Sequence, residues 1–461
     1  MAARHRLIDR PDGGPLFHRP GGPVGADGFL RHAHALAAQI TALQPGPGGQ
    51  LVNLCRDRYA FAVAFAAGLI LHRTSLLNAD LATLGDTVFG TGQACLVLAD
   101  MPIATALPVL QVAIASHPPN APPAENPAIP ADHLAAIVFT SGSTGQPVAH
   151  RKVWAELVAR SRAAALQFGP DDTTLRVVPD DTTSRVVSTA TPLTGTIIGM
   201  VPPQHMYGFE TTILLPLHAP VGSWCGPAFY PADLLALPPC PAPRTLVTTP
   251  MQLRALLQAG LDLPVDACIS ATAPLDPALA AAIEQRFGIP VLEIFGATEC
   301  GSIASRRATS GPDWSLYRGI DLSIAPHGAT VRAEGMAPIP LADVLEPVPG
   351  GFRLLGRRTD VVKLGGRRAS LPGLNQLLAA LPGIEDGAFV VPDDLDHRST
   401  ARLVAVVVAP HRTDSDILAD LRRMIDPVFL PRRLIRVDAL PRNALGKLPR
   451  QAMLDLVAAA E

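Results

Sequence analysis

Apolar and polar positions along the chain predict an alternation of strands and helices. Between residues 28 and 43 the apolar positions recur at helical spacing, and Asp27 can cap that helix. The same reasoning predicts further helices at residues 59–71, 153–165, 250–259 and 277–287. Short apolar runs predict strands at residues 50–54, 95–98, 112–115, 134–139, 197–201, 245–248, 267–270 and 291–295. This alternation favours an α/β fold with a largely parallel sheet.

The pattern changes near residue 357, after a strand predicted at 352–355 and a dense charged link. Beyond the link we expect a helix capped by Ser370, strands at 388–391, 403–408 and 434–437, and helices at 416–425 and 450–458. We therefore predict a large N-terminal domain of layered, mainly parallel sheets with helices at residues 1–356. A hinge at 357–360 then leads to a small, mobile C-terminal α+β domain at 361–461.

Composition narrows the class of protein. The 461 residues are 48% hydrophobic with mean hydropathy +0.25, which is typical of a globular chain, and the net charge of −2 gives no reason to expect nucleic acid. The longest apolar run, residues 60–71, is too short for a membrane span, and residues 1–10 lack the apolar segment of a signal peptide. Six scattered cysteines include no CxxC pair, so the expected compartment is the cytoplasm.

Lysine usage is unusual. Of the 38 lysines and arginines, only Lys152, Lys363 and Lys447 are lysines. Where a general positive charge would serve, this chain uses arginine, so we expect a lysine where a compact ammonium on a flexible stem is needed. All three lie beside glycine-containing motifs, although chance explains any one of them equally well.

A loop rich in glycine and hydroxyl groups follows the apolar run at 134–139. Residues 140–147 read Thr-Ser-Gly-Ser-Thr-Gly-Gln-Pro. Gly142 and Gly145 let the backbone approach a ligand, and successive backbone N–H groups in such a loop form an anion-binding nest. The loop is thus a candidate phosphate cradle, but no Gly-Lys-Ser/Thr follows, so it is not a Walker A loop. An ordinary linker is the equal alternative for this stretch alone.

Three other polar segments follow predicted strands. His205, residues 271–275 and the pair Thr298-Glu299 each come directly after a strand. Ligands of open α/β sheets bind beyond the carboxyl ends of the strands, so we expect these segments and the loop to share one site. Glu299 would suit Mg²⁺ held mainly by substrate phosphates. Taken alone, a single histidine is more often structural, and a single glutamate is more often a solvated loop residue.

A tandem duplication separates the glycine loop from His205. Residues 170–178 and 179–187 are nine-residue copies that differ at one position. Two copies are too few for a repeat fold, so we expect an extended hairpin or a surface loop without a catalytic role.

Together, these motifs resemble those of the adenylate-forming (AMP-binding) superfamily, which includes acyl- and aryl-CoA synthetases, carrier-protein adenylation domains and luciferases. The resemblance covers residues 51–454, and the motifs occur in the family's order. They lie at residues 140–147, 203–208, 270–275, 295–299, 341–344, 356–357, 363–367 and 441–450.

The resemblance implies a role for each matching residue. Lys447, Glu299 and His205 would be catalytic, with Lys447 reaching the substrate carboxylate and α-phosphate, and His205 beside the acyl pocket. Glu299 and the Thr144 hydroxyl would hold Mg²⁺ with ATP, and Asp343 would bind the ribose. The expected nucleotide- and cofactor-binding residues are Thr140, Ser141, Gly142, Ser143, Thr144, Gly145, Ala273, Pro274, Phe295, Gly296, Thr298, Asp343, Arg357 and Gly366, the last lining a thiol channel.

The implied reaction is ATP-dependent, AMP-forming activation of a carboxylic acid, followed by transfer to the thiol of CoA or an acyl-carrier protein. Details of the chain resemble small bacterial ligases of aryl-polyene or similar lipid-like pathways, which favours an aryl or medium acyl acid. Because the two half-reactions need different surroundings, a small domain on a hinge would present Lys447 first and the thiol channel second.

Some positions depart from the family pattern and keep alternatives open. The loop usually continues Pro-Lys-Gly, but here Val148 replaces the lysine, and Arg151 or Lys152 would have to replace it from another register. One alternative is a non-catalytic member that binds nucleotide or a carrier protein as a scaffold. Another is an adenylating enzyme with a different closing step, as in β-lactone synthetases. The presence of Glu299 and Lys447 argues for catalysis.

Overall fold

The chain folds into two compact units in the computed structural model. The first comprises Met1–Gly311, Ser315–Asp321 and Val331–Ile339, and the second comprises Pro312–Trp314, Leu322–Thr330 and Pro340–Glu461. The structure describes residues 3–46, 48–77, 95–116, 123–141, 147–169, 175–179, 184–188, 192–325, 328–333, 336–357, 361–364, 367–391, 403–442 and 448–460.

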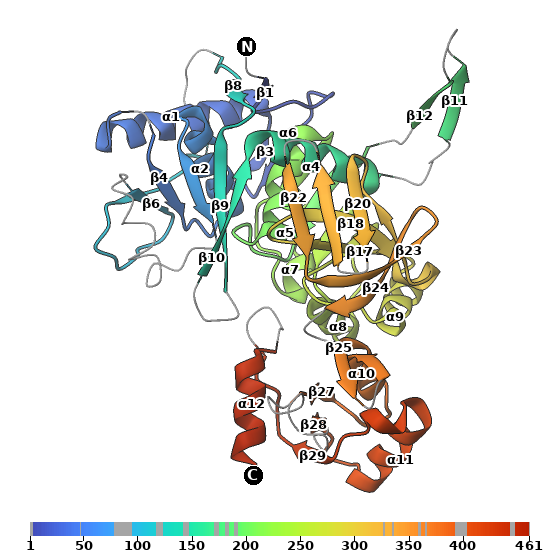
Figure 1. The fold of residues 1–461 in the computed structure, drawn as a ribbon. Helices are drawn as coiled ribbons and strands as arrows, with labels where there is room; N and C mark the ends of the chain where they lie inside the picture. The colour runs from blue at the N-terminus through green and yellow to red at the C-terminus, as the bar shows by residue number, and fades with distance from the viewer. Residues whose placement is uncertain are drawn as a thin grey trace. The chain divides into compact units, whose positions relative to one another are not determined.

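A six-stranded sheet of the first unit has the order β10-β9-β5-β4-β6-β7. Its strands are β4 (Gln50–Asn53), β5 (Thr74–Leu77), β6 (Cys95–Ala99), β7 (Val109–Gln111), β9 (Leu134–Ser141) and β10 (Pro147–Val153). Neighbours are parallel except β9 and β10, which form an antiparallel pair. Helices α1 (Ala26–Leu43) and α2 (Arg58–Ile70) pack side by side, and α2 contacts β4 and β5 (Figure 1). Helix α2 is buried along almost its whole length because it is apolar on all sides.

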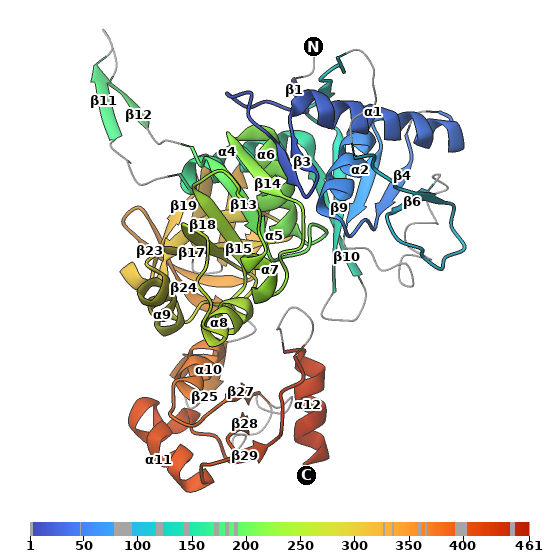
Figure 2. The same ribbon diagram turned by 180° about the vertical axis from the view of Figure 1, so that it is seen from behind.

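A second sheet contributes to this unit the run of strands β18-β17-β16-β15-β13-β14-β2-β3, and β19 (Asp313–Leu316) pairs with β18 beyond it. Its strands are β2 (Phe17–Arg19), β3 (Gly22–Val24), β13 (Gly195–Gly199), β14 (Val221–Trp224), β15 (Arg244–Thr248), β16 (Ala267–Ser270), β17 (Val291–Ala297) and β18 (Gly301–Arg307). The strands from β2 to β17 in this order are parallel, and Figure 2 shows β13, β14 and β15 side by side. Helices α8 (Pro250–Ala259) and α9 (Pro277–Phe287) pack on each other and bury Leu253, Leu256 and Ile283 in a common core.

The remaining elements of the first unit are shorter. Helix α4 (Trp154–Gln167) follows β10, and α7 is Pro231–Leu235. A buried segment runs from α5 (Met206–Phe209) through a π-helical turn (Glu210–Leu214) to α6 (Leu215–His218). Strand β1 (Arg4–Arg6) pairs with β8 (Ala128–Pro130), and β11 (Leu175–Pro179) pairs with β12 (Ser184–Ser188). A 3₁₀ turn (Ala308–Ser310) precedes β19 (Asp313–Leu316), β20 (Ile320–Ala325), β21 (Gly328–Ala333) and β22 (Met336–Leu341), four strands whose residues divide between the two units.

The second unit is a small α+β assembly. Strands β23 (Asp343–Val348) and β24 (Gly351–Arg357) are antiparallel, as are β25 (Val361–Leu364) and β26 (Arg367–Ser370). A three-stranded sheet of β27 (Asp386–Val390), β28 (Val404–Val408) and β29 (Arg433–Arg436) packs with α10 (Leu371–Ala379), α11 (Asp414–Met424), a 3₁₀ turn (Pro427–Phe429) and α12 (Arg450–Ala459). Its core joins Leu378, Val407 and Leu421, which are fully buried.

The expected fold class is confirmed. Of the duplicated segment, for which a hairpin or a surface loop was expected, the described residues form the antiparallel pair β11–β12. Two local expectations are wrong. Asp27 does not cap α1, because the helix begins at Ala26, two residues before the expected start, and the Asp27 carboxylate instead accepts from Arg31 Nε at 2.8 Å. The strand expected at 112–115 instead covers Val109–Gln111 as β7, and Val109 pairs with Val97 of β6. The domain boundaries stay a prediction, since residues 358–360 of the expected hinge lie outside the described residues.

Helix α5 is fixed to the second sheet by one phenol. The Tyr207 hydroxyl donates to the Ile269 carbonyl oxygen at 2.8 Å, with the Thr248 carbonyl oxygen 3.2 Å away, and the side chain is buried. Tyr207→Phe leaves buried carbonyls short of a donor, so we expect the free energy of unfolding to fall by about 1–2 kcal/mol. Denaturant unfolding at pH 7 measures this. Tyr230→Phe, at an exposed tyrosine, is the control, and equal midpoints for the two variants would contradict the prediction.

Candidate active site

The polar segments predicted from the sequence gather at one edge of the second sheet. Because β13, β15, β16 and β17 are parallel neighbours, the segments that follow them leave at the same edge. Hydrogen bonds join these segments directly. Gln252 Nε2 at the start of α8 donates to the Met200 carbonyl oxygen after β13 at 2.8 Å, and Tyr207 reaches the ends of β15 and β16. The edge is therefore a connected surface rather than a set of separate loops.

Arg58 determines the path of the chain toward His205. Its guanidinium is buried and donates to the carbonyl oxygens of Gly199 at 2.8 Å and Val201 at 3.0 Å, and also to the Thr212 hydroxyl. Burial lowers the pKa of Arg58. His205 is half-buried and occupies the position before the first residue of α5, with extended backbone angles. The sequence showed no reason to single out Arg58, which lies 147 residues from His205.

The segment after β16 contains a strained residue. Thr272 has φ +79°, a conformation that a β-branched residue rarely adopts and that costs about 1–3 kcal/mol. Its hydroxyl oxygen is buried and has no hydrogen-bond partner within the described part of the chain. The expected contact residues follow at once, Ala273 half-buried and Pro274 exposed. Strain of this kind concentrates at functional sites, and residue type alone gave no sign of it.

Glu299 lies in the turn that joins β17 to β18. Phe295 and Gly296 end β17, Thr298 and Glu299 are half-buried, and Ala297 pairs with Gly301 across the turn. Gly301 has φ +71°, and a Cβ there would lie 2.4 Å from Glu210 Oε1, so no other residue fits.

Buried charged side chains support this turn. Lys152 Nζ donates to Glu156 Oε1 at 3.0 Å and to the backbone carbonyl oxygen of Glu299 at 2.7 Å. Glu210 accepts from Ser302 Oγ at 2.5 Å, and although burial raises the pKa of Glu210, these hydrogen bonds oppose the rise. Lys152 is completely buried with its ammonium already bonded, which argues against it as a replacement for the loop lysine missing at Val148.

The phosphate loop is described only at its two ends. Thr140 and Ser141 end β9, where their backbones pair with Val148 and Pro147 of β10. The central loop residues Gly142, Ser143, Thr144 and Gly145 lie outside the described residues. The helix expected at 153–165 is α4, which begins at Trp154, and between the loop and this helix the chain returns as β10, a strand that was not predicted from the sequence.

Asp343 and Arg357 are brought together within the second unit. Asp343 begins β23, Arg357 ends β24, and the two are register partners. Asp343 is half-buried, while only the backbone of Arg357 is described. The other two expected residues of this unit, Gly366 and Lys447, lie outside the described residues.

The residue set fits a magnesium ion held mainly by a nucleotide. Within the described ranges, no group of three or more His, Cys, Asp or Glu side chains could hold a metal ion. Mg²⁺ commonly takes one or two carboxylates and completes its coordination with phosphate oxygens and water. The half-buried Glu299 meets that requirement.

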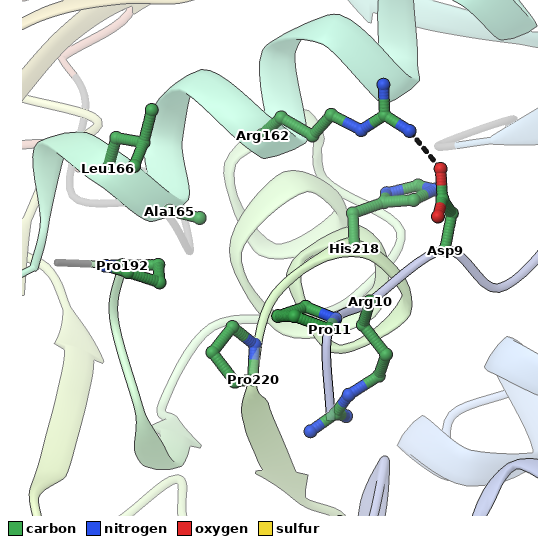
Figure 3. A pocket seen from close by; sticks show the side chains of 9 residues that line it. All are labelled: Asp9, Arg10, Pro11, Arg162, Ala165, Leu166, Pro192, His218 and Pro220. Carbon is green, nitrogen blue, oxygen red and sulfur yellow. Dashed lines mark hydrogen bonds and ion pairs between the residues drawn. The ribbon is translucent and has the colours of Figure 1, made fainter. Parts of the chain in front are cut away.

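A cavity of about 370 Å³ lies elsewhere in the first unit. Figure 3 shows Arg162 of α4 reaching Asp9 across it, with His218 alongside. None of the residues expected to be catalytic or nucleotide-binding lines it, so we do not place the reaction there. Burial lowers the pKa of His218 to about 3, and Arg162 acts in the same direction.

None of the helices in the described part of the chain combines the length and apolar character that a membrane crossing would require.

Comparisons with known proteins agree with this geometry. The sequence profile of the family described as "AMP-binding enzyme" matches residues 78–340. A 4-coumarate–CoA ligase of Halorhodospira halophila is 29% identical over 68% of this chain and 75% of its own length. A probable 2-succinylbenzoate–CoA ligase of Mycobacterium tuberculosis is 28% identical over 70% and 84%. The structure of ATP-bound MatB from Rhodopseudomonas palustris shares the fold with a TM-score of 0.74 at 18% identity, covering 96% of this chain and 95% of that one.

Such a fold, with polar segments at the carboxyl ends of parallel strands, is that of an adenylate-forming enzyme. The chain belongs to the AMP-binding enzyme family. This membership confirms the resemblance stated from the sequence and the expected enzyme class, an AMP-dependent acid–thiol ligase.

The buried His218 predicts a pH-dependent contribution to stability. The folded state holds this imidazole neutral, whereas the unfolded chain protonates it near its ordinary pKa of 6.5, so stability is lost as the pH falls below about 6.5. His218→Leu removes that loss. From pH 7.5 to pH 5.0, the difference in unfolding free energy should move in favour of the variant by about 2 kcal/mol. Denaturant unfolding at both pH values measures it, with His411→Leu at an exposed histidine as control; an unchanged difference would contradict the assignment.

Proposed function

We propose that this enzyme activates a carboxylic acid with ATP and transfers the acyl group to the thiol of CoA or an acyl-carrier protein. The observation that carries the proposal is the gathering of His205, Ala273 and Glu299 at the edge formed by parallel strands in a chain of the AMP-binding family. The two alternatives left open by the sequence, a scaffold and an enzyme with a different closing step, become outcomes of the assays below.

The relatives support an aryl acid as the first substrate class to test. Both ligases named above act, by their names, on acids that carry an aromatic ring. Medium acyl acids stay in the proposal as the second substrate class to test. All six cysteines are free, which supports a reducing compartment such as the cytoplasm.

The chemistry has two steps. A carboxylate oxygen attacks the α-phosphorus of ATP; the new P–O bond forms as the bond to the bridging oxygen breaks, and pyrophosphate leaves with the electron pair. A thiolate then attacks the acyl carbon, a C–S bond forms, and AMP leaves. Bound Mg²⁺ would supply positive charge at the phosphates. We assign Glu299 and Thr144 to hold it, and the loop from Thr140 to Gly145 to cradle the phosphates through backbone N–H groups.

Residues of the second unit would bind the ribose and the reacting groups, and residues of the first unit would bind the adenine. We assign the ribose to Asp343, the neighbouring ribose or phosphate oxygens to Arg357, and the substrate carboxylate and α-phosphate to Lys447. The adenine would lie against Ala273, Pro274 and the segment from Phe295 to Thr298. The proposal includes a hinge at 357–360, about which the domain at 361–461 would present first Lys447 and then Gly366.

Acid-dependent release of pyrophosphate tests the proposal directly. We expect MgATP to release pyrophosphate with at least one member of a panel of aryl and medium acyl acids. Adding CoA or a phosphopantetheine-loaded carrier protein should raise the turnover, and the acceptor that does so identifies the second substrate. Silence across the panel by a protein that still binds ATP would support the scaffold. Adenylate formation that no thiol accelerates would support a different closing step.

Lys447→Ala tests the lysine of the small domain. Loss of a point charge that stabilises the developing negative charge should lower the rate of adenylation on the order of 100-fold or more, while ATP still binds. Acid-dependent pyrophosphate–ATP exchange measures the rate, and calorimetry measures ATP binding. Lys447→Arg is the matched variant, because it keeps the charge but not the compact ammonium. Unchanged exchange in Lys447→Ala would remove this residue from the mechanism.

A further inference from the structure

The ammonium of Lys152 joins two segments that are far apart in the sequence. Lys152 lies on β10, the strand that leaves the phosphate loop, and its Nζ bonds the backbone carbonyl oxygen of Glu299 at 2.7 Å. The β9–β10 pair has a register shift between Lys152 and Val153, and such a bulge re-aims the side chain beside it. The backbone of the β17–β18 turn is thus attached to the strand pair that carries the loop.

The direction of β10 supports this link. Side chains alternate along a strand, so Val148, His150 and Lys152 share one face. The hydrogen bond from Lys152 to the Glu299 carbonyl oxygen places the Lys152 end of this face at the turn. The position that lacks the usual loop lysine, Val148, is on the same face and is partly exposed. This face of β10 therefore extends from the end of the phosphate loop to Lys152, which bonds the Glu299 carbonyl oxygen.

The hydrogen bond between Lys152 and the Glu299 carbonyl oxygen comes from a buried, charge-paired ammonium, so it holds the turn in a fixed position. Lys152 is 0% exposed, and Glu156, in the first turn of α4, is buried and pairs with it at 3.0 Å. A buried ammonium is costly unless it is paired and hydrogen-bonded, so the chain tolerates it only where its contacts are kept. The two partners of this ammonium are a single carbonyl oxygen and a single carboxylate oxygen, which suits a compact point charge.

We propose that Lys152 is a positioning residue for nucleotide binding, fixing the Glu299 turn relative to the phosphate loop through the Glu299 carbonyl. Glu156 neutralises the buried ammonium and is not itself needed for the geometry of the turn. The inference rests on the proposed function for the role of Glu299, but the link between the two segments is testable without any acid substrate.

A double-mutant cycle separates positioning from stability. Lys152→Met leaves a buried carboxylate without its partner, and Glu156→Met leaves a buried ammonium, so each should lower Tm by about 5 °C or more. The double variant K152M/E156M buries no charge at these positions and should recover Tm to within about 2 °C of wild type. Of these three variants, Glu156→Met alone retains Lys152 and hence the hydrogen bond to the Glu299 carbonyl oxygen.

Two readouts decide the proposal. Calorimetry should give a dissociation constant for MgATP raised about 10-fold or more in K152M and in the double variant, and less than about 3-fold in Glu156→Met. Hydrogen exchange of the nucleotide-free protein should quicken at residues 298–302 in the same two variants only. A double variant with wild-type exchange and wild-type MgATP affinity overturns the proposal, as does a Glu156→Met variant that loses both as fully as K152M.

These outcomes are distinct from a failure of the proposed function. If wild type binds MgATP but no acid in the panel releases pyrophosphate, the ligase proposal fails while the affinity comparison still decides the role of Lys152. If wild type binds no MgATP, a positioning role in nucleotide binding is overturned, whatever the exchange at the turn shows.

Discussion

The parallel pairing of β13, β15, β16 and β17 is the constraint on which the candidate site depends. Parallel strands release the chain at one edge, so polar segments separated by up to a hundred residues leave the sheet together. Their positions come from side chains that bond backbone carbonyl oxygens, namely Arg58, Tyr207 and Gln252. The parallel sheet sets where the segments leave, and these three hydrogen-bond donors fix their positions.

The second requirement is electrostatic. Lys152 and Arg160 are buried close to Glu156 and Glu210. Without these neighbours, each buried charge would cost several kcal/mol of desolvation free energy. Burial raises the pKa of Glu210 and lowers that of Arg160, while the attraction between them opposes both changes. Such a set adds little to net stability, because desolvation offsets much of the attraction. Two of these side chains bond the β17–β18 turn directly, Lys152 at the Glu299 carbonyl oxygen and Glu210 at Ser302, so the buried charges restrict the arrangement of the turn.

Sequence reasoning was reliable where the signal is local and periodic. The strands at β13, β15, β16 and β17 and the helices α8 and α9 lie where the apolar runs predict them. It failed where partners are distant. Strand β10 is polar and charged, and it is a strand because β9 offers it a ladder. The positive φ of Thr272 and the partner of Lys152, 147 residues away, leave no mark in their own neighbourhoods.

The same comparison changes the meaning of Val148. From the sequence, the lysine usual at position 148 is missing, and Arg151 or Lys152 would have to replace it. In the structure, the ammonium of Lys152 bonds the backbone of the Glu299 turn. Lys152 lies four residues after Val148, on the same face of β10. An ammonium buried with a carboxylate cannot also follow a phosphate through the reaction. If this enzyme adenylates acids, the charge at its transition state must therefore come from groups other than Lys152, which places more of that demand on Lys447 and on the backbone N–H groups of the loop.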